Sequence, residues 1–410
     1  MQKVANSNLH DAKKNKKDEF YTQLSDIENE LQHYKAHFKD KIVYCNCDDP
    51  LASNFFKYFL LNFKHLNLKG LMATCYKSQN YREVSDENSP KKAYAIMIGK
   101  NNKAFKNGGG GGNSHLLDDI EKILELDLAK QDEDNFKDNL KLFEKNLSKL
   151  QEKIFPLKAD EPQEQTLFEI TEDNELNNAG DFRSKDCIEL LKLADIVVTN
   201  PPFSLFREYV AQLVEYDKKF LIIGNKNAIT YKETFSLIKE NKIWLGITSA
   251  NVFLKPNENR TGFILTKQVN GLTRWFSNLT HKKRNEPLET IASYKKNPEQ
   301  YPKYDNYDAI NVDKTIEIPL DFDGVMGVPI TFLDKHNPKQ FEIVGITDRQ
   351  GSSGLRTKKY TKEDTPKYND LNARSVLVIN GEYKQQYPRI LIRKIAEVDE
   401  LRKQEQEKMQ

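Results

Sequence analysis

The stretch Asp195-Ile196-Val197-Val198-Thr199-Asn200-Pro201-Pro202-Phe203 joins an apolar strand to a rigid turn. Its apolar half predicts a short strand that is buried on both faces, as the strands of parallel sheets are. Pro201 and Pro202 each fix a φ angle, so the strand is expected to end at Asn200. Open α/β sheets bind their ligands at the carboxyl ends of the strands. The stretch therefore predicts an α/β fold with Asn200 at a ligand-binding edge.

The chain on either side of this stretch alternates between strand and helix patterns. Strand patterns occupy 41–47, 70–76 and 219–224, and helix patterns occupy 53–63, 184–193, 205–214 and 230–239. A strand, a helix and a strand in that order indicate parallel βαβ units. After residue 280 the helix patterns largely end, and short strand-like pieces lie in chain rich in Asn, Lys, Tyr and Pro. We therefore expect a large α/β domain and then a smaller, mixed or β-rich domain.

Asn200 and Pro201 bring two hydrogen-bond acceptors to one point, because the rigid turn holds the Asn200 side-chain oxygen near the Pro201 carbonyl. Two fixed acceptors suit an exocyclic amino group, which offers two hydrogens. As such a nitrogen attacks a methyl group it becomes tetrahedral and positively charged, so preplaced acceptors stabilise the transition state more than the planar ground state. Phe203 offers a stacking face for the ring. The alternative is structural: a strand end with a proline turn and a packed Phe203.

The tetrapeptide Asn200-Pro201-Pro202-Phe203 resembles the catalytic motif of S-adenosylmethionine-dependent amino-methyltransferases. The longer string that ends at Tyr209 resembles, in particular, the EcoRI-type adenine-specific DNA methyltransferases. Further matches to that family run in one order at 19–23, 45–50, 180–184, 221–230, 275–279 and 323–330. The resemblance implies a Rossmann-like sheet with flanking helices, plus a smaller C-terminal mixed or β-rich target-recognition domain. It implies methyl transfer from S-adenosylmethionine to the N6 amino group of a flipped-out adenine in DNA, as the modification component of a restriction–modification system.

The resemblance also implies a cofactor site made from three motifs. Their residues are Phe20, Tyr21, Thr22, Asp48, Asp49, Pro50, Asp181 and Phe182. The Thr-type residue of the first motif contacts the methionine part of the cofactor, and the carboxylate and ring of the third hold its adenine. The second motif lies where the first strand meets its helix. Because the Gly-x-Gly commonly found there is absent, the choice between Asp48 and Asp49 stays open.

We expect three parts of the chain. Residues 1–18 form a basic, flexible N-terminal arm, 19–290 the catalytic domain, and 291–410 the target-recognition and DNA-binding region. The catalytic domain carries an insert at about 101–178, which includes the five glycines Gly108–Gly112. This run fits a flexible loop better than a phosphate-binding loop, since no strand, Gly-loop and helix with a following Lys-Ser/Thr surround it.

The charge of the chain is nearly balanced but unevenly distributed. The 63 Lys+Arg and 61 Asp+Glu residues give a net charge of +2. Residues 116–180 contain 18 acidic and 8 basic residues, whereas 255–300 contains 4 and 9, and 351–410 contains 9 and 13. Basic tracts neutralise phosphates, so we expect double-stranded DNA as the partner. The residues expected to contact it are Asn225, Lys226, Lys282, Lys283, Arg284, Arg349 and Arg389.

Other interpretations remain open. The same chemistry on an RNA adenine or a protein glutamine is one, and a catalytically inactive DNA-binding relative is another. Four cysteines form no disulfide framework, and neither a membrane-spanning apolar run nor a secretory signal is evident, so we expect a cytoplasmic protein without a membrane partner. A cognate restriction endonuclease is expected to share the target site without a stable complex. We expect no metal; the alternative, zinc at His33, His37, Cys45 and Cys47, lacks a C-x2-C pair.

Overall fold

The structure is a computed structural model. It describes residues 21–47, 49–75, 93–101, 104–105, 115–130, 132–154, 168–171, 173–174, 176, 178–250, 252–256, 263–265, 272–363, 365–368 and 370–395. The predicted arm at 1–18, Phe20, Asp48 and the glycine run Gly108–Gly112 lie outside the described residues. Contacts divide the chain into two compact units: Met1–Lys226 with Gly246–Leu279, and Asn227–Leu245 with Thr280–Gln410.

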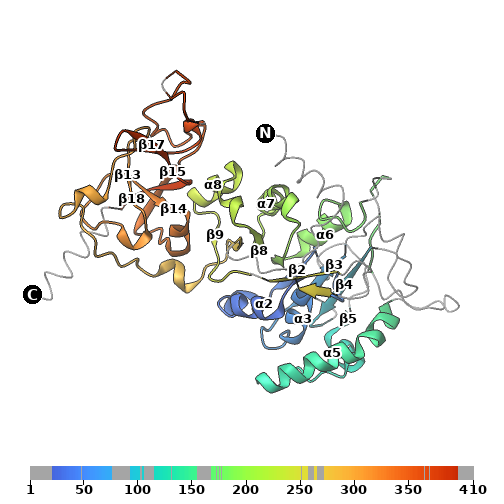
Figure 1. Cartoon of the computed structure of the whole chain (residues 1–410). Coiled ribbons are helices and arrows are strands. Elements are labelled where there is room, and N and C mark those ends of the chain that lie inside the picture. Colours follow the sequence, from blue (N-terminus) through green and yellow to red (C-terminus); the bar gives the residue numbers. More distant parts are fainter. Residues whose placement is uncertain are drawn as a thin grey trace, which may run out of the picture. The chain divides into compact units, whose positions relative to one another are not determined.

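The first unit is built around a large mixed sheet (Figure 1). Across the sheet the strands follow the order β5 (His115–Leu116), β4 (Tyr94–Gly99), β3 (Gly70–Thr74), β2 (Ile42–Cys45), β7 (Ile196–Thr199), β8 (Lys219–Asn225) and β12 (Thr273–Ser277), and β6 (Phe168–Glu169) pairs with β4. The central strands β3, β2, β7 and β8 run parallel to one another. β4 and β12 pair antiparallel with β3 and β8. The prediction of an α/β fold is confirmed.

Helices cover both faces of this sheet (Figure 1). They are α2 (Leu24–Leu31), α3 (Asn54–Leu61), α4 (Leu117–Leu124) and α5 (Glu133–Ile154) on one face, and α6 (Lys185–Leu193) and α7 (Phe206–Glu215) on the other. Successive side chains of a strand point to opposite faces. Trp275 accordingly joins the core under the first group of helices. Its neighbour Phe276 packs against Phe206 of α7, with ring centroids 5.0 Å apart.

Two helices begin at serine caps near the carboxyl ends of the strands. Ser53 accepts a hydrogen bond from the backbone N–H of Phe55 at 3.2 Å and starts α3. Ser184 accepts one from the N–H of Cys187 at 3.4 Å and starts α6. Such caps satisfy backbone donors that a helix leaves unpaired in its first turn. They fix where each helix leaves the preceding loop.

A small antiparallel sheet and a buried carboxylate complete the first unit. The sheet contains β1 (Tyr21–Thr22), β10 (Phe253–Pro256) and β11 (Phe263–Leu265). The fully buried Glu30 of α2 accepts hydrogen bonds from Tyr34 Oη at 2.9 Å, Ile247 N at 2.8 Å, and Thr248 N and Oγ1 at 2.6 Å each. Gly246 leaves room for this carboxylate, since a Cβ there would collide with Glu30 Oε1. Glu30 thus ties α2 to a segment more than half the chain away.

The second unit contains α8 (Lys232–Lys239) and mostly short strands. Its four-stranded sheet has the order β13 (Ile310–Asn311), β14 (Met326–Pro329), β18 (Arg389–Lys394) and β15 (Phe341–Ile346). β16 (Val376–Ile379) and β17 (Glu382–Gln385) form a separate two-stranded ribbon. The unit also holds β9 (Trp244–Leu245) and 3-10 turns at Lys282–Asn285, Pro298–Gln300, Thr315–Glu317, Ile330–Lys335 and Leu371–Ala373.

We expect the stability of the second unit to depend on pH through His336. The imidazole is buried, with Nε2 2.9 Å from the carbonyl oxygen of Phe341, and burial lowers its pKa to about 4. Because the folded state holds the ring neutral, its contribution to stability is complete above an unfolded-state pKa of about 6.5 and is lost as the pH falls through the folded pKa. We expect acidification from pH 7 to 4 to remove about 3 kcal/mol of stability through this group.

The measurement is urea unfolding of the full chain and of His336→Gln at both pH values. The amide of Gln keeps a donor for the Phe341 carbonyl but does not titrate, so the variant should lose less stability on acidification. Equal losses in the two proteins would contradict the assignment.

Candidate active site

The two central strands of the first unit create a ligand-binding edge. From β2 the chain proceeds to β3 on one side, and later to β7 and β8 on the other side. The carboxyl ends of β2 and β7 therefore form the point at which strand order reverses, where open α/β sheets bind ligands. Tyr44 of β2 lies opposite Val197 of β7. Since the strands are parallel in this register, Asn46 lies level with Thr199, one position before Asn200, at the same edge of the sheet.

The Asn-Pro-Pro-Phe tetrapeptide occupies this edge. Asn200 is 7% exposed, Pro201 is buried, and Pro202 leads directly into a 3-10 turn at Phe203–Leu205. The N–H of Leu205 donates to the carbonyl of Pro202 at 2.9 Å, which closes the turn before α7 begins. Phe203 is only partly buried, with one part of its ring against the core. The turn thus keeps Phe203 partly exposed, three residues after the buried Asn200.

Tyr209 of α7 fastens this edge to the end of β2. Its hydroxyl donates a short hydrogen bond to Asn46 Oδ1, and the thiol of Cys47 lies 3.6 Å from the same oxygen. Complete burial raises the pKa of Tyr209 well above its ordinary value, so the hydroxyl stays protonated and remains a donor. Asn46 is itself buried. Sequence reasoning assigned no role to either residue, although both lie in segments with family resemblance.

The Asp49 carboxylate is fixed in place by hydrogen bonds from neighbouring residues. Its carboxylate accepts hydrogen bonds from Tyr94 Oη at 2.6 Å and from the N–H of Leu51 at 2.9 Å, and the thiol of Cys75 lies 3.8 Å away. Burial raises its pKa, and the hydrogen bonds partly offset that shift. Its backbone carbonyl accepts from Ser53 N–H at 2.7 Å. Asp49 therefore shapes the loop between β2 and α3, and Pro50 is buried within that loop.

Tyr21 and Thr22 form β1, close to the start of α3. Asn54, the first residue of α3, donates its side-chain amide to the carbonyl of Thr22 at 2.8 Å. Thr22 is 1% exposed, and its Oγ1 has no hydrogen-bond partner within the described residues. The same holds for Thr199 Oγ1 at the end of β7. Buried hydroxyls usually find a partner, so these two oxygens indicate that a polar ligand completes the edge.

The segment with Asp181 and Phe182 reaches the same neighbourhood through Tyr209. The Phe182 ring meets the Tyr209 ring edge-on, with centroids 4.9 Å apart, and is 5% exposed. Asp181 accepts both Nε and Nη2 of Arg183, each at 2.8 Å, and the Asp181 side chain is 11% exposed. Arg183 continues to Glu208 of α7 at 2.8 Å. α7 therefore contacts two segments that the sequence analysis singled out. Tyr209 contacts Asn46 at the end of β2, and Tyr209 and Glu208 contact residues 182 and 183.

The residues expected to contact DNA have unlike surroundings. In the first unit Asn225 ends β8, and Lys226 follows it; both are partly exposed. In the second unit Lys282 is exposed and Lys283 partly so, whereas Arg349 is exposed but paired with Asp370 at 2.7 Å.

Arg284 and Arg389 are the buried members of that set. The Arg284 guanidinium stacks over Trp244 at 4.1 Å and donates to Asn241 Oδ1 at 2.9 Å, and burial lowers its pKa to about 10. Arg389 is 8% exposed and lies 3.4 Å from Asp313. Both guanidinium groups serve internal contacts in this structure, which does not favour phosphate contact by them.

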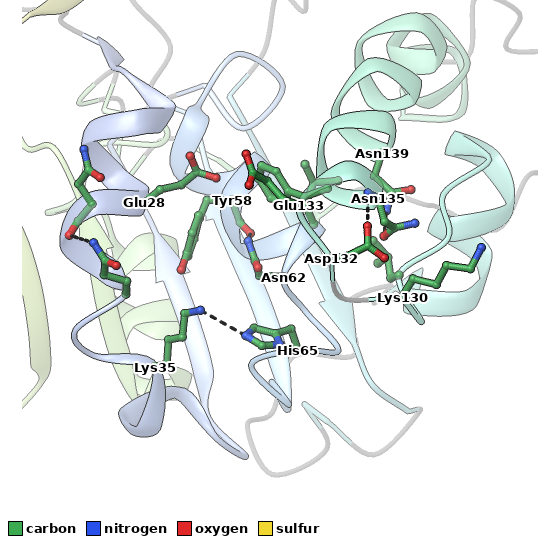
Figure 2. A pocket seen from close by; sticks show the side chains of 15 residues that line it. Glu28, Lys35, Tyr58, Asn62, His65, Lys130, Asp132, Glu133, Asn135 and Asn139 are labelled. Carbon is green, nitrogen blue, oxygen red and sulfur yellow. Dashed lines mark hydrogen bonds between the residues drawn. The ribbon is translucent and has the colours of Figure 1, made fainter.

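A cavity of about 340 Å³ lies elsewhere in the first unit, among α2, α3 and the start of α5 (Figure 2). Glu28, Tyr58 and Glu133 line it, and none of the predicted catalytic or cofactor residues does. Burial and the Glu133 charge raise the pKa of Glu28.

Across the described ranges, no group of three or more His, Cys, Asp or Glu residues is placed to hold a metal ion. In that same part of the chain no helix is long and apolar enough to cross a membrane.

A mixed α/β sheet that carries Asn-Pro-Pro-Phe at its strand reversal is the arrangement expected of an amino-methyltransferase. The chain belongs to the family described as adenine-specific methyltransferase EcoRI, whose model matches residues 8–395. The resemblance stated from the sequence is thereby confirmed, and the protein is an adenine-specific methyltransferase.

Three curated relatives support this assignment. The chain is 44% identical to Type II methyltransferase M.EcoRI of Escherichia coli over 354 residues, which cover 83% of this chain and 89% of the relative. It is 33% identical to Type II methyltransferase M.MgeORF184P of Mycoplasma genitalium over 93% of this chain and 97% of the relative. It is 34% identical to Type II methyltransferase M.MpnI of Mycoplasma pneumoniae over 81% and 83%. No solved structure gives a significant match.

Proposed function

We propose that this methyltransferase modifies the N6 amino group of an adenine that is flipped out of double-stranded DNA, as the modification component of a restriction–modification system. The observation that carries the proposal is the position of Asn200–Phe203 at the strand reversal of the sheet. The family description names adenine, which disfavours the protein-glutamine alternative. The Type II names of the relatives favour a DNA-modifying role.

We propose S-adenosylmethionine as the methyl donor, bound along a Rossmann-like edge of the sheet. The unpartnered oxygen of Thr22 fits the donor groups of the methionine part, and the adjacent Tyr21 belongs to the same strand. The Phe182 ring and the Asp181 carboxylate suit the adenine part. Of the second motif, Pro50 and Asp49 shape the loop, and Asp48 remains a proposal from sequence alone. When bound, this cofactor supplies an electrophilic methyl group on a sulfonium.

The chain's own residues then act on the adenine. Phe203 stacks on the base, and the Asn200 side-chain oxygen and the Pro201 carbonyl accept the two amino hydrogens. Pro202 keeps the turn rigid. When the nitrogen takes the methyl group, the methyl–sulfur bond of the sulfonium would break and leave a neutral thioether. The nitrogen would become positively charged, which the two acceptors would stabilise, and it would then give up one proton to water. Alignment of the nitrogen with the methyl group accounts for much of the acceleration, and no covalent enzyme intermediate is needed.

We propose that the region 291–410, most of the second unit, is the target-recognition domain, and that the catalytic domain spans 19–290. Lys282 and Lys283 are the best placed of the predicted phosphate contacts because they are neighbours in one 3-10 turn, where Lys282 is exposed and Lys283 is partly exposed. A cognate restriction endonuclease would share the target sequence without remaining bound. Flipping costs a few kcal/mol, which stacking on Phe203 and backbone contacts offset.

The test is to incubate the full chain with S-adenosylmethionine that carries a labelled methyl group. Separate reactions also contain duplex DNA, RNA or protein. We expect label on duplex DNA, as N6-methyladenine at one sequence. Sequencing of DNA from cells that express the protein would identify that sequence. Label on RNA alone would overturn the proposal, and cofactor binding without any methyl transfer would favour an inactive DNA-binding relative.

Tyr209→Phe should reduce the rate of methyl transfer about tenfold. The variant keeps the ring contact with Phe182 but leaves Asn46 Oδ1 without its strong donor, so the end of β2 is held less firmly against the neighbouring end of β7. Single-turnover methyl transfer measures the effect. Tyr216→Phe, at the C-terminal end of α7, is the matched control and should leave the rate unchanged. A Tyr209→Phe rate equal to that of the control would contradict the role.

A further inference from the structure

The β16–β17 ribbon has a base and a tip of different character. Val376 and Leu377 at the base are buried. From Val378 onward most residues of the ribbon are exposed: Val378 is 47% exposed and Ile379 is 38% exposed, whereas Tyr383, opposite Val378, is partly buried. Apolar side chains at an exposed strand end contribute little to folding and invite aggregation unless a partner covers them.

The turn at the tip is well defined. Asn380 and Gly381 both have positive φ, 53° and 79°. Two such residues in a two-residue loop give the turn type that matches the twist of a hairpin, and Asn-Gly is its preferred sequence. The ribbon therefore ends in a regular hairpin turn.

The base of the ribbon is rigidly anchored in the second unit. Asn306 accepts the N–H of Val376 at 2.8 Å and donates to the carbonyl of Arg374 at 2.8 Å. The Tyr383 ring packs edge-on against Tyr360, with centroids 5.5 Å apart, beside the buried Val376. A rigid base with an exposed, shaped tip is an arrangement that presents side chains to a partner without a large ordering cost.

The chain segment that contains the ribbon is rich in basic residues, of which Arg389 is buried and Lys358 pairs with Asp305. Residues 356–389 contain eight Lys and Arg and four Asp and Glu. Lys359, Arg374 and Lys384 form no ion pair within the described residues. Tyr387, just beyond β17, is 82% exposed, and the Arg374 guanidinium lies 6.0 Å from its ring centroid. The charges of Lys359, Arg374 and Lys384 favour a polyanion as the partner, and the apolar tip favours a polyanion that also presents apolar groups.

We propose that the β16–β17 ribbon enters the major groove of the target duplex and reads bases there, an inference that rests on the DNA substrate proposed above. The major groove is about 12 Å wide and admits a two-stranded ribbon. Val378 and Ile379 point to opposite faces of the ribbon, and Ile379, on the face that also carries Lys384, then lies against base edges such as thymine methyl groups, which are the apolar features of that groove. Lys384 and Arg374 neutralise the flanking phosphates.

The test uses the full chain with both apolar residues of the tip replaced, Val378→Thr with Ile379→Thr. Threonine keeps the strand preference, and both positions are exposed, so the fold should persist. We expect the KM for the target duplex to rise at least about tenfold, the preference over single-mismatch duplexes to fall, and kcat at saturating DNA to change little. Ile291→Thr, at an 88% exposed position of the same unit, is the control and should behave as wild type.

Lys384→Ala separates phosphate contact from base reading. It should weaken binding to all duplexes alike and reduce the slope of log binding constant against log salt by about 1.

Three outcomes are distinguishable. Unchanged KM and preference in the double variant, with wild type active on duplex DNA, would overturn the ribbon assignment alone. Wild-type activity on RNA and not on duplex DNA would overturn the proposed function and the ribbon assignment with it. A wild-type dimer that the double variant converts to monomer in sedimentation velocity, with DNA kinetics unchanged, would assign the tip to a second copy of the chain.

Discussion

Asn200→Ala should lower kcat for methyl transfer by about 10³-fold while the affinity for S-adenosylmethionine stays within a few-fold of wild type. The substitution removes one of two acceptors aimed at the amino group in its charged, tetrahedral state, and loss of a single preorganised group of this kind costs about 10²–10³ in kcat. Here the acceptor also orients the nitrogen, so the effect is expected at the upper end of that range. Cofactor titration and single-turnover assays measure the two quantities separately.

Two further variants make this result specific. Asn200→Asp retains an oxygen acceptor at the same position, so it should keep more activity than Asn200→Ala. Asn62→Ala, at the C-terminal end of α3, removes the same type of side chain, whose amide donates to the Tyr58 carbonyl at 2.9 Å, and it should leave kcat unchanged. Full activity in Asn200→Ala would refute the role of the motif.

Glu30→Ala should destabilise the first unit by about 3 to 5 kcal/mol. The substitution leaves the N–H groups of Ile247 and Thr248 and two hydroxyls without the acceptor that they share. Each buried donor without a partner costs about 1–3 kcal/mol, and water entering the space recovers only part of that. Chemical unfolding, followed by circular dichroism, gives the free energy directly.

The control for Glu30 is another glutamate of the same unit. Glu189 of α6 pairs only with Lys192 at the surface, at 2.6 Å, so Glu189→Ala should change the free energy of unfolding by less than about 1 kcal/mol. If the two variants are equally stable, the buried carboxylate does not hold the segment 246–248 to α2.

The parts of the fold that the sequence predicts are those encoded locally. The β7 strand, the turn at Asn200 and the α7 helix follow one another without interruption, so hydrophobic pattern and proline chemistry suffice to place them. The direction of β4 was not predictable in this way. Its direction is set by pairing with Thr74 and its neighbours, which makes it antiparallel.

The parts that sequence reasoning missed depend on contacts between distant segments. Asn46 and Tyr209 are 163 residues apart, and neither residue type alone signals a hydrogen bond at the strand reversal. Lys283 and Arg284 are neighbours with equal charge, yet only Arg284 turns inward to Trp244. A basic tract reports charge density, whereas burial is set by the tertiary structure around each side chain.

The contact of Tyr209 with both Asn46 and Phe182 restricts the length of the chain between Pro202 and Tyr209. α7 begins at Phe206, and each residue of an α-helix advances the side-chain direction by about 100°. One inserted or deleted residue would therefore swing Tyr209 away from both partners at once. Arg207 and Glu208 lie on the exposed side of the same turn. In a library of variants this segment should accept replacements most readily at Arg207, since Glu208 pairs with Arg183 at 2.8 Å, and no change in residue number.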